Sequence, residues 1–237
     1  MNYNEQSKNS TLNIQHSALK HPLLEVKDVS HDFDYPLFKD INLTLNGAET
    51  IAIIGVSGSG KSTLLNIFSS LLIPNKGEVY YNNKNIFDLS KKELLEVRRN
   101  DFGIIFQAHY LFRGFNANEN LKISEFLSEK KIESDLLKSL KIDHVMKQGI
   151  GELSGGQQQR LSCARVMTKK PKIIFADEPT GNLDTQTANE VMDVLFDYVK
   201  SNDAGLIIVT HEEDIAYRCD KVYRLNEYKL EQLKWEI

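Results

Sequence analysis

The chain has 237 residues, of which 41% are hydrophobic and 26% charged, so it can bury a full core and has an ordinary globular composition. Its formal net charge is −4, which gives no bulk attraction to nucleic acid, and we expect no nucleic-acid partner. The two cysteines, Cys163 and Cys219, fit neither a metal-ligand spacing nor a disulfide framework. Two cysteines without a disulfide framework indicate that the protein lies in a reducing compartment. No apolar run approaches the roughly 20 residues that cross a bilayer, so we expect no membrane span.

The first segment, residues 1–22, is rich in Asn, Ser, Gln and Lys and lacks the apolar stretch of a secretory signal. Because this composition offers little surface to bury, we predict a mobile polar tail over 1–22. After it, apolar and polar residues alternate from Leu24 to Val29 and again from Ile41 to Leu45. This alternation predicts half-buried antiparallel strands, which would form a small β-region at the start of the fold.

A phosphate-binding loop follows in Gly55-Val56-Ser57-Gly58-Ser59-Gly60-Lys61-Ser62, which has Gly, four residues, then Gly, Lys and Ser. Its glycines let the backbone turn with its N–H groups pointing inward, which creates an anion site at a helix N-terminus. Lys61 adds a positive charge for the outer phosphates, and the Ser62 hydroxyl can ligate magnesium. The β-branched segment 50–54 before the loop and the helical apolar spacing after it supply the expected strand and helix.

After the phosphate loop, the sequence predicts a hairpin, a buried strand and then a helical region. Residues 78–81 followed by Asn82-Asn83 predict a short hairpin, and 102–106 predicts a buried strand that ends at Gln107. Residues 116–150 are rich in Leu, Lys, Glu and Ser with helical periodicity. We therefore expect a helical subdomain over 108–153, inserted into a nucleotide-binding core formed by 23–107 and 154–237, which includes the small β-region. Strands at 173–176 and 206–209, separated by a helix near 187–200, complete that core.

Two adjacent carboxylates leave the predicted strand 173–176. Asp177 and Glu178 would face opposite ways at the end of a buried apolar strand, so each can serve a different purpose. Asp177 can hold magnesium through its water shell, whereas Glu178 can polarise the water that attacks the γ-phosphate.

A second signal for phosphate is Leu153-Ser154-Gly155-Gly156-Gln157. Ser154 and Gln157 have capping-box spacing, so the local sequence alone predicts a helix start. Two glycines in a first helical turn cost about 1 kcal/mol each relative to Ala, which a purely structural cap would rarely accept. We interpret them as residues that leave the helix N-terminus open to a second phosphate contact.

Taken together and in this order, these segments and Thr210-His211 resemble an ABC-type ATPase cassette over about residues 23–230. The resemblance implies an α/β P-loop fold with a mixed central sheet, an N-terminal antiparallel β-subdomain and an inserted α-helical subdomain. It also implies ATP and Mg²⁺ as ligands and a head-to-tail dimer. Each ATP would lie between one copy's Gly55–Thr63 loop and the helix start, Ser154–Gln157, of a second copy.

The resemblance assigns roles to single residues of this sequence. Glu178, His211 and Gln107 would be catalytic, with His211 on the γ-phosphate. Ser62, Gln107 and Asp177 would hold the metal. Phe33 would stack on adenine where a Tyr is commoner, with Tyr35 as the other candidate, and Asp184 would lie in the turn through which the two sites sense each other. The remaining nucleotide contacts would come from Gly55, Ser57, Gly58, Ser59, Gly60, Lys61, Ser62, Thr63, Ser154, Gly155, Gly156 and Gln157.

Within the family, residues 179–184 and 106–121 resemble the lipoprotein-releasing (Lol-type) subfamily, which shares features with macrolide-exporter and cell-division (FtsE-type) ATPases. We favour lipoprotein release from the inner membrane, with integral membrane permease subunits as partners and a peripheral location on the cytoplasmic face. A macrolide-type tripartite exporter ATPase and a division regulator acting on a membrane scaffold stay open as alternatives.

Overall fold

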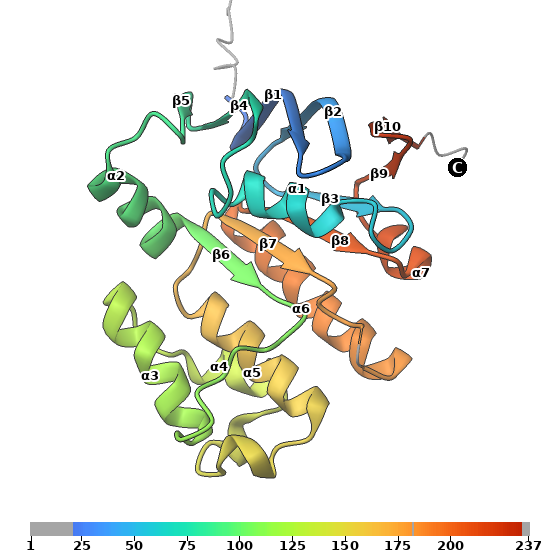
Figure 1. Cartoon of the computed structure of the whole chain (residues 1–237). Helices are drawn as coiled ribbons and strands as arrows, with labels where there is room; N and C mark the ends of the chain where they lie inside the picture. Colours follow the sequence, from blue (N-terminus) through green and yellow to red (C-terminus); the bar gives the residue numbers. More distant parts are fainter. Residues whose placement is uncertain (1–20, 182, 234–237) are drawn as a thin grey trace, which may run out of the picture.

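The computed structural model describes residues 21–181 and 183–233, and these form two sheets with helices packed between and below them (Figure 1). The predicted polar tail lies outside the described residues except for His21 and Pro22. Nothing in the described part of the chain is a helix long and apolar enough to cross a membrane.

The smaller sheet is antiparallel and lies at the top of Figure 1, in the order β2-β1-β4-β5. Its strands are β1 (Leu24–Asp32), β2 (Pro36–Leu45), β4 (Lys76–Tyr81) and β5 (Lys84–Asn85). Asn82 and Asn83, with φ of 47° and 63°, form the tight turn between β4 and β5. Asparagine tolerates this left-handed backbone, which explains why the predicted hairpin forms here.

The larger sheet has the order β10-β9-β3-β8-β7-β6. Neighbouring strands from β9 to β6 run parallel, and β10 pairs antiparallel with β9, so the predicted mixed sheet is confirmed. Its strands are β3 (Glu49–Ile54), β6 (Phe102–Ile105), β7 (Ile173–Asp177), β8 (Gly205–Thr210), β9 (Lys221–Asn226) and β10 (Lys229–Gln232).

The helices divide between the two sides of this sheet, and α3 and α4 lie far from the antiparallel sheet (Figure 1). They are α1 (Lys61–Phe68), α2 (Lys91–Glu96), the π-helix η1 (Val97–Asp101), α3 (Ala117–Ser128), α4 (Ser134–Ser139), α5 (Gly155–Met167), α6 (Thr185–Asn202) and α7 (Glu213–Ala216). Two 3-10 turns, η2 (Asp143–Val145) and η3 (Ile150–Glu152), lead from α4 to α5.

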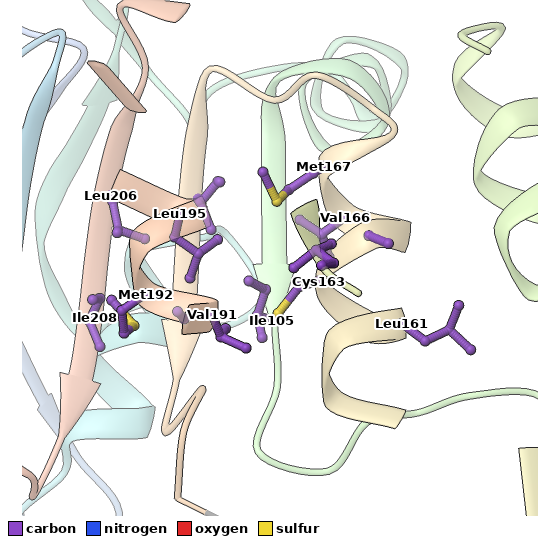
Figure 2. Packing of buried hydrophobic residues seen from close by; sticks show 14 of the residues in the cluster. Ile105, Leu161, Cys163, Val166, Met167, Val191, Met192, Leu195, Leu206 and Ile208 are labelled. Carbon is purple, nitrogen blue, oxygen red and sulfur yellow. The ribbon is translucent and has the colours of Figure 1, made fainter. Parts of the chain in front are cut away.

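Alternate residues of the central strands enter two separate hydrophobic clusters, as the period of two in a strand requires. In β7, Ile173 and Phe175 pack with α1 and the antiparallel sheet, whereas Ile174 and Ala176 pack with α5 and α6. Figure 2 shows part of this second cluster, in which α5 and α6 side chains, including the buried Cys163, meet β6 and β8. Because both faces are covered, polar residues of these strands must lie at their ends.

The region predicted as a helical insert shares that second cluster. Leu121, Leu140 and Leu153 pack into it together with the sheet residues Ile54 and Ile105. The described insert therefore has no core separate from the sheet, and the predicted domain boundaries at 108 and 153 stay a prediction.

Two features of the helices differ from the sequence pattern. Within the insert, Phe126 and Leu127 have the helical spacing of core residues, but they are 81% and 53% exposed at the end of α3. Before the insert, α2 and η1 occupy residues 91–101, a segment for which we made no helix prediction. α2 and η1 contain no buried residue, so the strong apolar signal of a buried helix is absent there.

We expect Gly77→Ala to lower the free energy of unfolding by about 2 kcal/mol. Gly77 has φ of 87°, and a Cβ there would lie 2.5 Å from the backbone of Asp28, where β1 bulges against β4. Chemical denaturation measures the change, with Gly114→Ala as the control because nothing lies within 4 Å of a Cβ at Gly114. Equal stability of the two variants would contradict this explanation of the bulge.

Candidate active site

A cavity of about 680 Å³ opens at the edge of the central sheet where its parallel strands end. It is lined by segments that follow β3, β6, β7 and β8, by the start of α1, and by the β1–β2 turn with the start of β2. The lining residues are Phe33, Tyr35, Leu37, Ser57, Gly58, Gly60, Lys61, Ser62, Thr63, Gln107, Glu178 and His211. The carboxyl edge of a parallel sheet is the usual place for a ligand in such folds.

The loop between β3 and α1 has the geometry expected of an anion site. Gly58 and Gly60 adopt φ of 79° and 97°, and Gly60 begins α1 without any side-chain cap, so no capping side chain occupies the first N–H groups of α1. A Cβ at Gly55 would lie 2.7 Å from the Leu225 carbonyl, so the close approach of β9 requires glycine there. The Lys61 ammonium, in a residue only 8% exposed, donates to the carbonyls of Gly55 and Val56 at 2.8 and 3.0 Å.

Two oxygen donors suited to a magnesium ion lie side by side at this edge. The Ser62 hydroxyl donates to the Asp177 carboxylate at 2.9 Å, across a separation of 115 residues in sequence. Burial raises the pKa of Asp177, because the charged carboxylate is partly removed from water. A divalent cation would compensate that cost, so the residues present fit Mg²⁺.

The Glu178 carboxylate has different partners from that of Asp177. The φ of Glu178, 46°, turns the chain sharply after β7. One carboxylate oxygen lies 2.9 Å from His211 Nδ1, and the other accepts a hydrogen bond from the Thr210 hydroxyl at 3.1 Å. The carboxylate is thus held by the last residue of β8 and the residue that follows it. Sequence reasoning missed the contact from Thr210, although a hydroxyl immediately before His211 was a visible signal.

Phe33 and Tyr35 line the same cavity and are 58% and 61% exposed. An exposed aromatic ring beside a phosphate loop is suited to stacking on a flat heterocycle. Gln107 lines both this cavity and a neighbouring one of about 420 Å³ that reaches towards α5.

The remaining predicted residues do not line the cavity. Ser154 and Gln157 form the expected capping box at the start of α5, with hydrogen bonds of 2.9 and 3.2 Å. A Cβ at Gly155 would meet nothing within 4 Å, so no contact inside the described chain explains that glycine. Asp184 caps α6 by accepting from the Thr187 N–H at 3.0 Å, and that hydrogen bond lowers its pKa.

Comparison with known proteins now identifies the family, because the ABC transporter family model matches residues 38–181. This chain belongs to the ABC transporter family. Its curated relatives include three proteins named lipoprotein-releasing system ATP-binding protein LolD. The protein from Rickettsia bellii is 39% identical over 87% of this chain and 96% of its own, and that from Francisella tularensis subsp. tularensis is 36% identical over 88% and 96%. The protein from Xanthomonas euvesicatoria is 37% identical over 84% of each chain.

Solved structures of ABC cassettes have the same fold. A dimeric post-hydrolysis state of the ATP-binding cassette MJ0796, bound to ADP and Pi, matches with a TM-score of 0.81 and 30% identity, over 90% of this chain and 99% of that one. The protein cbiO1 from Clostridium perfringens, part of the ABC transporter complex cbiONQ, matches with a TM-score of 0.77 and 30% identity, over 89% of this chain and 87% of that one. The ABC ATPase and the fold class predicted from the sequence are confirmed.

We expect the imidazole pKa of His211 to lie above its ordinary value of about 6.5. The hydrogen bond and charge of Glu178 favour the protonated ring and raise its pKa. The contact therefore stabilises the folded ABC subunit at pH below about 6.5, and this stabilisation is lost as pH rises through the raised value. NMR titration of the nucleotide-free protein measures the shift.

In that titration, Glu178→Gln should return the His211 pKa towards the ordinary value, whereas Glu231→Gln, which changes an exposed carboxylate elsewhere, should not. A His211 pKa that is the same in all three proteins would contradict the assigned contact.

Proposed function

We propose that this chain hydrolyses ATP to drive a membrane permease that releases lipoproteins from the inner membrane. The likeness to proteins named LolD over most of both chains supports the proposal most directly. The cavity at the sheet edge supports the ATP-hydrolysing part of the proposal, because its phosphate loop and polar residues match what phosphoryl transfer requires.

In this proposal, the Gly55–Thr63 loop binds the phosphates through its backbone N–H groups, and Lys61 exchanges its two loop carbonyls for phosphate oxygens. Phe33 stacks on the adenine, and Tyr35 is the alternative. Glu178 accepts a proton from the attacking water, and His211 contacts the γ-phosphate. Mg²⁺ would be held by Ser62, Asp177 and Gln107 and would neutralise charge between the outer phosphates.

The same proposal includes a second copy of the chain. Ser154–Gln157 lie away from the cavity, and a helix N-terminus with an uncovered glycine can bind phosphate from another subunit. A head-to-tail arrangement would bring this helix start against the partner's phosphate loop, with Asp184 near the boundary. The dimeric MJ0796 cassettes support such a pair, since they match over 90% of this chain.

A groove on another face is suited to the permease. It measures about 800 Å³ and lies between η1 and α3, where three exposed apolar side chains gather. They are Leu95, Phe126 and Leu127, and the cations Arg98, Arg99 and Lys169 also line the groove. Lys169 donates to the carbonyls of Arg98 and Phe102 at 2.7 Å each, so the groove is joined directly to the start of β6, the strand before Gln107. Contact there would place the subunit on the cytoplasmic face of the membrane.

Co-purification tests this function. We expect the chain, isolated from detergent-solubilised membranes, to bring with it permease subunits that have large extracytoplasmic domains, together with lipoproteins. Phe126→Glu should abolish the recovery of the permease by placing a charge in the apolar groove, while nucleotide binding persists. Tyr228→Glu, which changes an exposed aromatic in the β9–β10 turn, is the matched control.

The other outcomes separate the alternatives. Recovery of a permease with outer-membrane exporter components would favour the macrolide-type exporter. A division scaffold without lipoproteins would favour the regulatory ATPase, and either result would overturn lipoprotein release.

A further inference from the structure

A ring of hydrogen bonds, closed by the backbone between Glu178 and Thr180, holds Glu178, and two of its members have no role in the site described above. The Thr210 hydroxyl donates to Glu178 and accepts from the Glu212 N–H at 3.0 Å. The Glu212 carboxylate accepts from the Thr180 hydroxyl at 2.7 Å. Since Thr180 is two residues after Glu178 along the chain, the ring returns to its starting point.

Burial makes this ring well defined. Thr180 is 1% exposed and Thr210 is fully buried, so neither hydroxyl can readily exchange its partner for water. Glu212 is the N-cap residue of α7, yet its side chain makes no capping bond and is directed to Thr180 instead. A short bond from a buried hydroxyl to a carboxylate is charge-assisted and therefore among the stronger hydrogen bonds of a protein.

Thr180 also belongs to the turn that leads to Asp184. Its carbonyl accepts from the Leu183 N–H at 2.9 Å, and Asp184 then begins α6. A displacement of this turn would consequently move Glu212 through its bond with Thr180. Because the Glu212 N–H donates to Thr210, the movement would also reach the Glu178 carboxylate, which Thr210 contacts. The Glu178 carboxylate is held by its contacts with the Thr210 hydroxyl and the His211 ring.

We propose that Thr180 and Glu212 are positioning residues that hold the Glu178 carboxylate in its orientation and link it to the turn containing Asp184. This inference rests on the proposed role of Glu178 in activating water. It predicts that the bond between Thr180 and Glu212 affects the turnover of bound ATP and leaves ATP binding unchanged.

The test uses the full chain with the membrane proteins that co-purify with it, and measures steady-state ATP hydrolysis. We expect Thr180→Val, which keeps the shape and removes the hydroxyl, to lower kcat about tenfold, equivalent to about 1.4 kcal/mol, with KM for ATP within about twofold. Thr180→Ser should restore most of the activity because it keeps the donor. Thr168→Val is the matched control, since Thr168 is also a buried threonine whose hydroxyl binds a backbone carbonyl of its own helix.

A double-mutant cycle separates the proposed link from general loss of structure. If the two side chains act through their shared bond, Thr180→Val combined with Glu212→Leu should lower kcat no further than the worse single variant. Multiplied losses would overturn the link, as would a kcat of Thr180→Val within twofold of the original. Should Thr180→Val fail to fold, Glu212→Leu still decides, because it removes the acceptor of the same bond and must lower kcat about tenfold, whereas a kcat within twofold of the original would overturn the link.

Glu178→Gln distinguishes the two levels of the proposal. If that variant keeps full turnover, the role of Glu178 itself fails. If it abolishes turnover while Thr180→Val and Glu212→Leu do not reduce kcat, only the positioning role fails.

Discussion

Burial of both faces of the central parallel sheet is the constraint on which the site depends. Side chains of β3, β7 and β8 alternate between two apolar clusters, so these strands have no room for charge along their length. Polar groups can occur only where the strands end, and the carboxyl ends of parallel neighbours lie together. The phosphate loop, Gln107, the Asp177-Glu178 pair and His211 are consequently brought to one edge from positions up to 156 residues apart (211 − 55). ATP chemistry is thus placed by the same packing that stabilises the sheet.

Features fixed by local chemistry could be predicted from the sequence. Glycines with positive φ mark the phosphate loop, the spacing of Ser154 and Gln157 predicts a capping box, and Asn82-Asn83 predicts a tight turn, because each depends on a few adjacent residues. The order of these segments was enough to predict an ABC cassette, which the family match confirms. The roles of the individual site residues stay predictions, since they concern a bound nucleotide and a second subunit.

Features fixed by distant packing were not visible in the sequence. Phe126 and Leu127 have the helical spacing of core residues but are exposed, because α3 buries a different set, including Leu121, against α5 and the sheet. Strands β9 and β10 were missed because Glu227 and Tyr228 form their turn at φ of 45° and 68°, where a glycine would have been the signal. The contact of Thr180 with Glu212 spans 32 residues and depends on how two loops meet. No local pattern encodes such a contact.

The central claim is that ATP is bound between two copies of this chain and hydrolysed with the help of Glu178. The most direct measurement is size-exclusion chromatography with light scattering of Glu178→Gln, with and without MgATP. This variant keeps the phosphate contacts and loses only the carboxylate that activates water, so the account predicts a stable dimer with MgATP and monomers without it. A second variant, Glu178→Gln combined with Ser154→Arg, should stay monomeric because the helix start of α5 is blocked. A Glu178→Gln protein that binds ATP but stays monomeric, or a dimer unaffected by Ser154→Arg, would contradict the account.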